Sequence, residues 1–176
     1  APARKRRDVK RVQVSTVQEA LIMACEMESS AVQLYTRALN LMRQLGRQGE
    51  ALYEGLDRLR RDELEHLRQF RALCGEDGVA PERRMALAAA AQNVLFEGGL
   101  MGAARQGLLE SVERMLRFAM RCEAISAQKY REFAAIAENP SAREALLMIA
   151  SEEDRHLGVL AAQNAQYKKE GVFNEP

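Results

Sequence analysis

The two histidines are the residues of this sequence whose type and spacing most clearly point to metal chemistry. His66 and His156 are the only histidines among the 176 residues, and each follows a glutamate by three positions, Glu63 and Glu153. Residues three apart lie side by side on one face of a helix. With glutamate at roughly a tenth of positions, both histidines would have this spacing by chance in about one sequence in a hundred. The spacing therefore predicts two Glu-x-x-His ligand pairs.

Glutamates also interrupt four lines of apolar residues. The apolar residues recur at steps of three and four, which is typical of a helix buried along one face. A buried and unpaired carboxylate costs several kcal/mol, and no lysine or arginine lies on any of the four lines to neutralise it. Protonation of the carboxylates is one way to avoid this cost, and binding of cations is the other. The four glutamates are Glu28, Glu63, Glu123 and Glu153.

Two divalent cations would balance the charge of such a core, because four carboxylates and two neutral imidazoles carry −4. One glutamate from each of two helices plus a Glu-x-x-His from each of the other two is the ligand set of di-iron and di-manganese bundles. Oxygen-rich ligands suit iron or manganese better than structural zinc, although the affinity order leaves zinc open as an alternative. The predicted metal ligands are Glu28, Glu63, His66, Glu123, Glu153 and His156.

Four long helices are needed to position these side chains. Their apolar lines span residues 17–42, 52–73, 109–137 and 142–160. Thr16 and Glu19 offer a capping box at the start of the first helix, and Gly46 offers a stop at its end. Asn139-Pro140 provides an N-cap followed by proline at the first position of the last helix.

The connections between these helices predict the topology. The first and second helices, and the third and fourth, are joined by short segments, which make antiparallel hairpins. About thirty residues separate the second helix from the third, with a short helix expected from Pro81 to about Phe96 before the glycines at 98, 99 and 102. A join of that length crosses the bundle, as in ferritin-like topology. We therefore expect an all-α, four-helix bundle at residues 16–168, between tails at 1–15 and 169–176.

The two hairpins repeat each other. Glu123 follows Glu28 by 95 residues, and Tyr130 follows Tyr35 by the same number. The two Glu-x-x-His pairs are offset by 90 residues, and both stand in an [Asp/Glu]-Glu-x-x-His-Leu context. The chain is thus expected to be a duplicated hairpin with pseudo-twofold symmetry.

These motifs resemble the rubrerythrin family of ferritin-like proteins. Glu28-Ser-Ser-Ala-Val-Gln-Leu-Tyr35 and Glu123-Ala-Ile-Ser-Ala-Gln-Lys-Tyr130 each precede one of the two histidine motifs, and the similarity covers residues 16–168. The resemblance implies a centre of two non-haem iron ions that reduces hydrogen peroxide or oxygen, and a homodimer.

The resemblance also implies a role for each site residue. Glu63 and Glu153 would bridge the two metals, and Glu28 and Glu123 would complete their coordination. His66 and His156 would each bind one metal terminally. Tyr35 and Tyr130 would donate hydrogen bonds that orient the ligands.

Two departures from the family pattern qualify this expectation. The sequence has no Cys-x-x-Cys motif of the rubredoxin-like domain that delivers electrons in typical members, so an external electron donor is expected. Ser126 stands where the family has an additional glutamate. Two other functions therefore stay open: oxidation of ferrous iron for storage or hand-over, and a metal-stabilised structural module without turnover.

Charge and cysteine content address partners and location. Residues 1–11 carry six basic side chains and one acidic one, a charge of +5 within a net charge of +1. Such a run could contact nucleic acid, an anionic membrane or an acidic partner, but a solvated tail is the expectation. No aromatic residue interleaves with these charges to stack on nucleic-acid bases. Cys25, Cys74 and Cys122 are widely spaced, which favours a reducing compartment over a disulfide scaffold. Cys25 and Cys122, which are off the buried lines, are expected to be inert packing residues.

No membrane span is expected. The longest apolar run, Met85–Ala91, is far shorter than the roughly 20 residues that a transmembrane helix needs. The expected location is cytoplasmic.

Overall fold

The computed structural model describes residues 12–75 and 78–173 of the chain. The basic segment at residues 1–11 therefore lies outside the described residues. All regular elements in the described part are helices, which confirms the predicted all-α class. They are α1 (Val17–Gln44), α2 (Ala51–Leu73), α3 (Pro81–Leu95), α4 (Gly99–Arg105), α5 (Val112–Ile136) and α6 (Pro140–Glu170).

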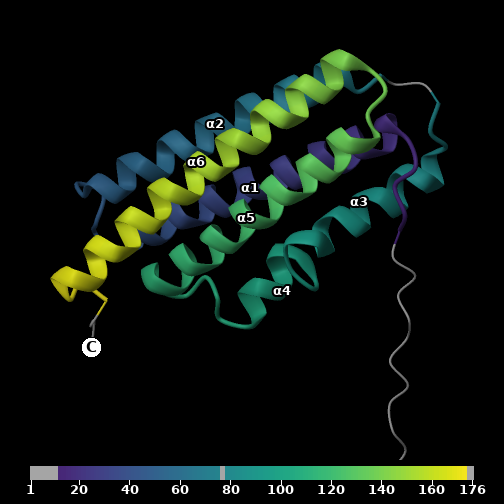
Figure 1. Ribbon diagram of the computed structural model, residues 1–176. Helices are drawn as coiled ribbons and strands as arrows, with labels where there is room; N and C mark the ends of the chain where they lie inside the picture. Colours follow the sequence, from purple (N-terminus) through teal and green to yellow (C-terminus); the bar gives the residue numbers. More distant parts are fainter. Residues whose placement is uncertain (1–11, 76–77, 174–176) are drawn as a thin grey trace, which may run out of the picture.

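Four long helices form the bundle, and two short ones belong to the crossover. Short connections join α1 to α2 and α5 to α6, so each pair is an antiparallel hairpin. The hairpins pack through α1 against α5 and through α2 against α6. Figure 1 shows α2 and α6 together on one side of the bundle, and α3 and α4 along the opposite side, outside α1 and α5.

The expected capping residues begin the helices. The Thr16 side chain accepts a hydrogen bond from the N–H of Glu19, 3.2 Å away. The Asn139 side chain accepts from the N–H of Ser141 at 2.9 Å, directly before Pro140 at the first helical position. Such caps satisfy donors that have no partner within the helix. Gly46, with φ +68°, follows the end of α1 in the left-handed region that a C-terminal stop requires.

The start of α5 differs from the expectation. The apolar line predicted a helix directly after Gly107, but α5 begins at Val112. The Ser111 side chain accepts from the N–H of Arg114 and caps the helix there. Gly107, at φ +71°, lies in a turn before it. Spacing of apolar residues alone does not distinguish a buried turn residue from the first turn of a helix.

Helix α4 was not predicted. It begins after Gly98, whose φ of +79° turns the chain out of α3. A Cβ on Gly102 would lie 2.3 Å from the carbonyl oxygen of Glu97, so only glycine fits that position. The glycines therefore build a tight turn between two short helices.

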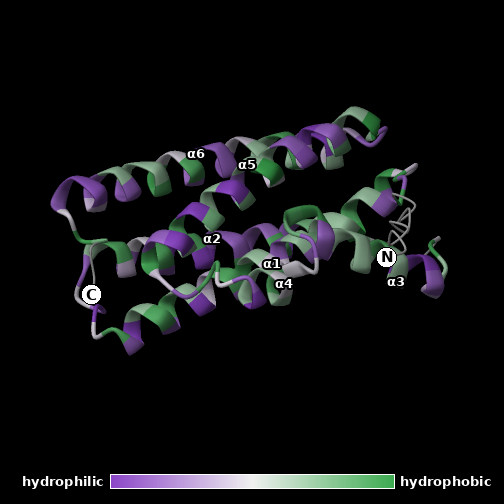
Figure 2. Cartoon of the chain, turned by 90° about the horizontal axis from the view of Figure 1, so that it is seen from below, coloured by the Kyte–Doolittle hydropathy of each residue, from purple (hydrophilic) through white to green (hydrophobic). Residues whose placement is uncertain are grey.

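The core follows the apolar lines. Figure 2 shows hydrophobic and hydrophilic residues alternating within the turns of α5 and α6, as expected for helices with one buried face. Among the described residues, no lysine or arginine is buried, whereas eight other polar residues are. No helix in the described part of the chain combines the length and the apolar character needed to cross a bilayer.

Candidate metal centre

Six buried polar side chains lie in the middle of the bundle, and they are the six predicted from the sequence. Each is at most 2% exposed. Helices α1 and α5 each contribute one glutamate, while α2 and α6 each contribute a glutamate and a histidine. They are Glu28, Glu63, His66, Glu123, Glu153 and His156.

These side chains form two overlapping groups, each of which could hold a metal ion. Within each group, one nitrogen or oxygen atom per residue lies within 4.8 Å of all the others. Glu63 and Glu153 belong to both groups. The first group is Glu28, Glu63, His66 and Glu153, and the second is Glu63, Glu123, Glu153 and His156.

Several of these atoms are buried without a hydrogen-bond partner. They include one oxygen of each glutamate and Nδ1 of His156. Nδ1 of His156 lies 3.0 Å from Oε1 of Glu63, yet the two atoms do not form an aligned hydrogen bond. Buried polar atoms without partners are costly and rare. These oxygens and nitrogens converge on one region, so the residues present suit a metal pair that replaces the protons bound there in its absence.

The two imidazoles face the cluster in the same way. Nδ1 of His66 lies 3.1 Å from Oε1 of Glu153 and 3.3 Å from Oε2 of Glu63. The rings of His66 and His156 are stacked, with centroids 5.6 Å apart and an interplanar angle of 22°. Nδ1 is therefore the atom through which each histidine could bind a metal, whereas Nε2 contacts a carboxylate outside the cluster.

Two acidic residues hold the outer nitrogens of the histidines. Nε2 of His66 lies 2.5 Å from Oε2 of Glu152, and Nε2 of His156 lies 3.2 Å from Oδ2 of Asp62. Each contact joins α2 to α6, and Arg155 also binds Asp62 at 3.1 Å. A carboxylate on the far nitrogen selects the tautomer that leaves Nδ1 free to bind a metal. Sequence reasoning did not assign this role, although both residues directly precede the glutamates of the histidine motifs.

Removing one of these carboxylates should weaken metal binding. We expect Asp62→Asn and Glu152→Gln to lower metal affinity by about 10- to 100-fold, because the histidines lose the partner that orients them. Competition with a chromophoric chelator measures this change. Glu65→Gln is the matched control, since Glu65 is exposed on α2 and forms a surface ion pair with Arg68 at 3.2 Å. Equal affinities in all three variants would exclude the orienting role.

Two buried tyrosines link the hairpins. The Tyr35 hydroxyl on α1 donates to Oε1 of Glu123 on α5, and the Tyr130 hydroxyl on α5 donates to Oε1 of Glu28 on α1, the latter at 2.6 Å. The same two glutamates leave Oε2 without a partner. Each tyrosine thus holds one carboxylate oxygen and leaves the other facing the cluster. The two tyrosine–glutamate hydrogen bonds are equivalent under the pseudo-twofold symmetry that the 95-residue offset indicated.

A family model confirms the fold that carries this cluster. The model of the ferritin-like domain matches residues 16–166, which include all six cluster residues. The chain belongs to the ferritin-like family. No curated protein and no solved structure matched the chain in the other two comparisons.

The electrostatics of this ferritin-like centre reflect the burial of its charges. Burial and the charge of Glu63 raise the pKa of Glu28 well above its usual value, and burial has the same effect on Glu153. Burial alone would raise the pKa of Glu63, but contacts with His156 and His66 outweigh it and lower that pKa to about 2. Without metal, protons bound to the groups around Glu63 therefore neutralise part of the negative charge of the cluster.

The pKa values of both histidines are raised by the surrounding carboxylates. Burial alone would lower the pKa of His156, but the facing Glu123 and Glu63 raise it to about 10. The pKa of His66 is raised for the same reason, by Glu153, Glu28 and Glu63. Both imidazoles are therefore protonated at neutral pH when no metal is bound. Metal binding must displace these protons.

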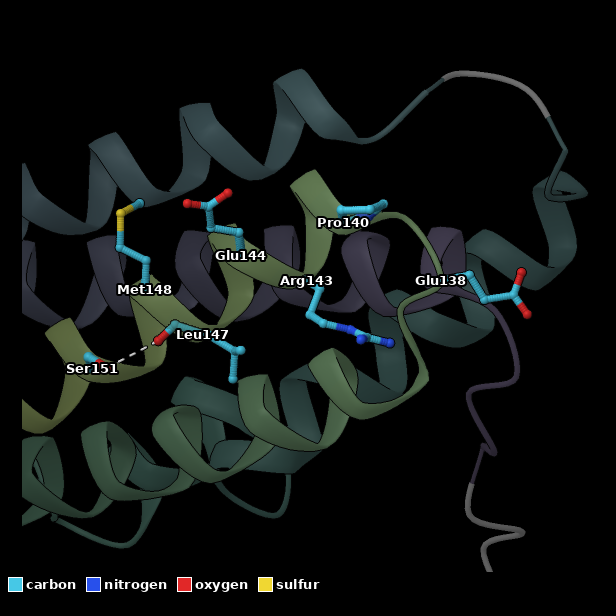
Figure 3. A pocket seen from close by; sticks show the side chains of 7 residues that line it. All are labelled: Glu138, Pro140, Arg143, Glu144, Leu147, Met148 and Ser151. Atoms are coloured by element: carbon cyan, nitrogen blue, oxygen red, sulfur yellow. Dashed lines mark hydrogen bonds between the residues drawn. The ribbon is translucent and has the colours of Figure 1, made fainter.

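The hollow shown in Figure 3 is separate from the centre. It measures about 530 Å³ and lies on the outer face of the first turns of α6, between Pro140 and Ser151. None of its lining residues belongs to either ligand group. Ser126, where the family resemblance led us to expect a further glutamate, is buried on α5 one turn after Glu123.

Proposed function

We propose that this ferritin-like chain is a non-haem di-iron oxidoreductase of rubrerythrin type, which reduces hydrogen peroxide or oxygen. The observation that supports this most directly is the pair of overlapping ligand groups that share Glu63 and Glu153. Two metals held by two shared carboxylates would be close enough to act on one small molecule, as in two-metal catalysis generally. The Glu-x-x-His motifs on α2 and α6 match the ligand set of di-iron carboxylate bundles.

The proposed roles follow from membership of the groups. Glu63 and Glu153 would hold both ions, whereas Glu28 and Glu123 would each hold one. His66 and His156 would each hold one ion through Nδ1. Iron fits this set of oxygen and nitrogen donors, with manganese or zinc as alternatives. When bound, the iron pair supplies the electrons that reduce the oxidant.

The protein side chains orient the ligands and exclude water. Tyr35 and Tyr130 are fully buried, and burial raises the pKa of both hydroxyls well above the usual value. They therefore remain protonated and act as hydrogen-bond donors to Glu123 and Glu28. Because the carboxylates are held before the reaction begins, little reorganisation is needed when charge develops nearby.

Burial and composition support the choice of substrate and reductant. The six ligands are at most 2% exposed, which favours a small oxidant such as hydrogen peroxide or oxygen over a larger substrate. The sequence contains no Cys-x-x-Cys pair for an electron-transfer iron site. A separate reductant is therefore part of the proposal.

Stopped-flow spectroscopy of the ferrous protein tests the proposal. We expect mixing with hydrogen peroxide or oxygen to oxidise both ions within one turnover, seen as growth of ferric absorption in the near ultraviolet. Tyr35→Phe should slow this oxidation by about 10- to 100-fold while two ions stay bound, because it removes an orienting hydrogen bond. Tyr53→Phe is the control, since Tyr53 lies near the surface under Arg43. A ferrous protein inert to both oxidants would refute the function.

A further inference from the structure

Two of the three cysteines meet at one end of the α1–α2 hairpin. Cys25 lies on α1, and Cys74 lies directly after the last residue of α2. Because the hairpin is antiparallel, the end of α2 reaches the first turns of α1 (Figure 1). Both side chains are half-buried and pack against the same core.

Polar contacts place the two sulfur atoms together. Nε2 of Gln18 lies 3.6 Å from Sγ of Cys74, and Gln18 is two helical turns from Cys25 on the same face of α1. The Cys25 thiol lies within hydrogen-bonding reach of the Cys74 sulfur. Cys74 thus lies along the α1 face that carries Cys25. Sequence spacing did not reveal this pair, because 49 positions separate the two residues.

We propose that Cys25 and Cys74 form a redox-active thiol pair, which hydrogen peroxide converts into a disulfide between α1 and the end of α2. The inference goes beyond the proposed function, in which hydrogen peroxide is a substrate at the metal centre. The disulfide would record exposure of the protein to that oxidant.

The reaction balances with hydrogen peroxide as the two-electron oxidant. One sulfur attacks a peroxide oxygen, the O–O bond breaks, and a sulfenic acid and one water form. The second sulfur then attacks the sulfenic sulfur and displaces a second water. Two S–H bonds are lost and one S–S bond forms. The two thiols are oxidised, and the peroxide is reduced to two waters.

The local backbone allows the bond to close. A disulfide needs sulfurs about 2 Å apart, closer than two hydrogen-bonded thiols. Cys74 has φ −82° and ψ 96°, outside the helix, and its N–H is bound only to the carbonyl of Phe70. Cys122 differs, because it is 4% exposed within α5 and has no thiol beside it.

The acidity of the thiols indicates which sulfur reacts first. Burial raises the pKa of Cys25 to about 12. Burial also raises the pKa of Cys74, whereas Arg84 and the hydrogen bond from Cys25 lower it. Cys74 is therefore the attacking sulfur and Cys25 the resolving one, and the oxidation is slow at neutral pH because both groups are mostly protonated.

Thiol counting on the full chain tests the proposal. The protein is loaded with two equivalents of Zn²⁺, which has no redox chemistry, and is then treated with hydrogen peroxide, quenched and labelled with N-ethylmaleimide after denaturation. We expect labelling to fall from three thiols to one, with loss of two hydrogen atoms from the intact mass and recovery on reduction. Peptide mapping should identify the Cys25–Cys74 bond.

Single variants make the test specific. Cys122→Ser should form the disulfide as the unmodified chain does, while Cys25→Ser and Cys74→Ser should not. Three labelled thiols after prolonged exposure, a bond between two chains, or unchanged oxidation of Cys25→Ser would overturn the proposal. Because zinc stands in for iron, a failure of the di-iron reaction would leave this result unaffected, and the reverse also holds.

Discussion

Replacing Glu63 with alanine should remove both metal ions from the protein. Glu63 is a member of both ligand groups, so its loss deprives each ion of an oxygen donor and of negative charge at once. Loss of an orienting residue already costs about 10- to 100-fold in affinity, and loss of a shared ligand should exceed that. Elemental analysis after dialysis is expected to fall from two ions per chain to none.

Graded variants separate a shared ligand from a terminal one. Glu28 belongs to one group only, so Glu28→Ala should lower the content to one ion, held by the group around His156. Glu65→Ala, two positions from Glu63 on the exposed face of α2, and Glu26→Ala, two positions from Glu28 on α1, should both retain two ions. Circular dichroism verifies that each variant is helical. Identical metal contents for Glu63→Ala and Glu65→Ala would show that the assignment of the shared ligands is wrong.

The second large effect is on stability, where metal-free and metal-loaded protein should respond to pH in opposite directions. Without metal, Glu28 and Glu153 have raised pKa values, as do both histidines. The folded state then binds more protons than the unfolded one. The stability from the histidines is fully present below pH 6.5 and is lost as pH rises through the folded pKa, about 10 for His156.

The remaining shifted carboxylate does not offset this trend. The pKa of Glu63 is lowered to about 2, so its contribution is present above pH 4.5 and is lost only in stronger acid. The metal-free protein should therefore become less stable between pH 6 and pH 9. Metal ions compete with the protons on these same ligands, so metal affinity and the stability that it adds should rise over that range.

The size of the metal effect can be stated from binding linkage. Free metal at 1,000 times the dissociation constant adds about 4 kcal/mol per site, and two sites in a domain of this size raise the melting temperature by roughly 15–30 °C. Thermal unfolding with and without metal at pH 6, 7.5 and 9 measures both slopes. The linkage would be disproved by parallel pH profiles or by a melting temperature independent of metal.

The long helices and the cluster could be predicted from the sequence because the buried face of a helix requires apolar residues at regular steps of three and four. A glutamate such as Glu123 in the middle of an apolar line is conspicuous, since an unneutralised charge there would be too costly. Caps such as Asn139 are equally local, because the side chain and the donors that it binds lie within three residues. Neither inference required knowledge of which helices are neighbours.

The features that were missed depend on contacts between helices or on backbone angles. Asp62 could not be paired with His156 without knowing that α2 lies against α6. The meeting of Cys25 and Cys74 depends on where α2 ends, and helix ends are the least certain part of a sequence pattern. Helix α4 depends on a positive φ at Gly98, which a spacing of glycines does not specify.

The distribution of ligands between the two hairpins has a bearing on how such a domain arose. The hairpin of α1 and α2 provides three residues of the first group, and the fourth, Glu153, comes from α6. In the second group, the hairpin of α5 and α6 provides three residues, and the fourth, Glu63, comes from α2. A lone hairpin would leave its ion one donor short, whereas two identical hairpins about a twofold axis would each lend the other the missing carboxylate. Two copies of such a hairpin are therefore enough to complete both ligand groups, which fits the duplication that the sequence repeat indicates.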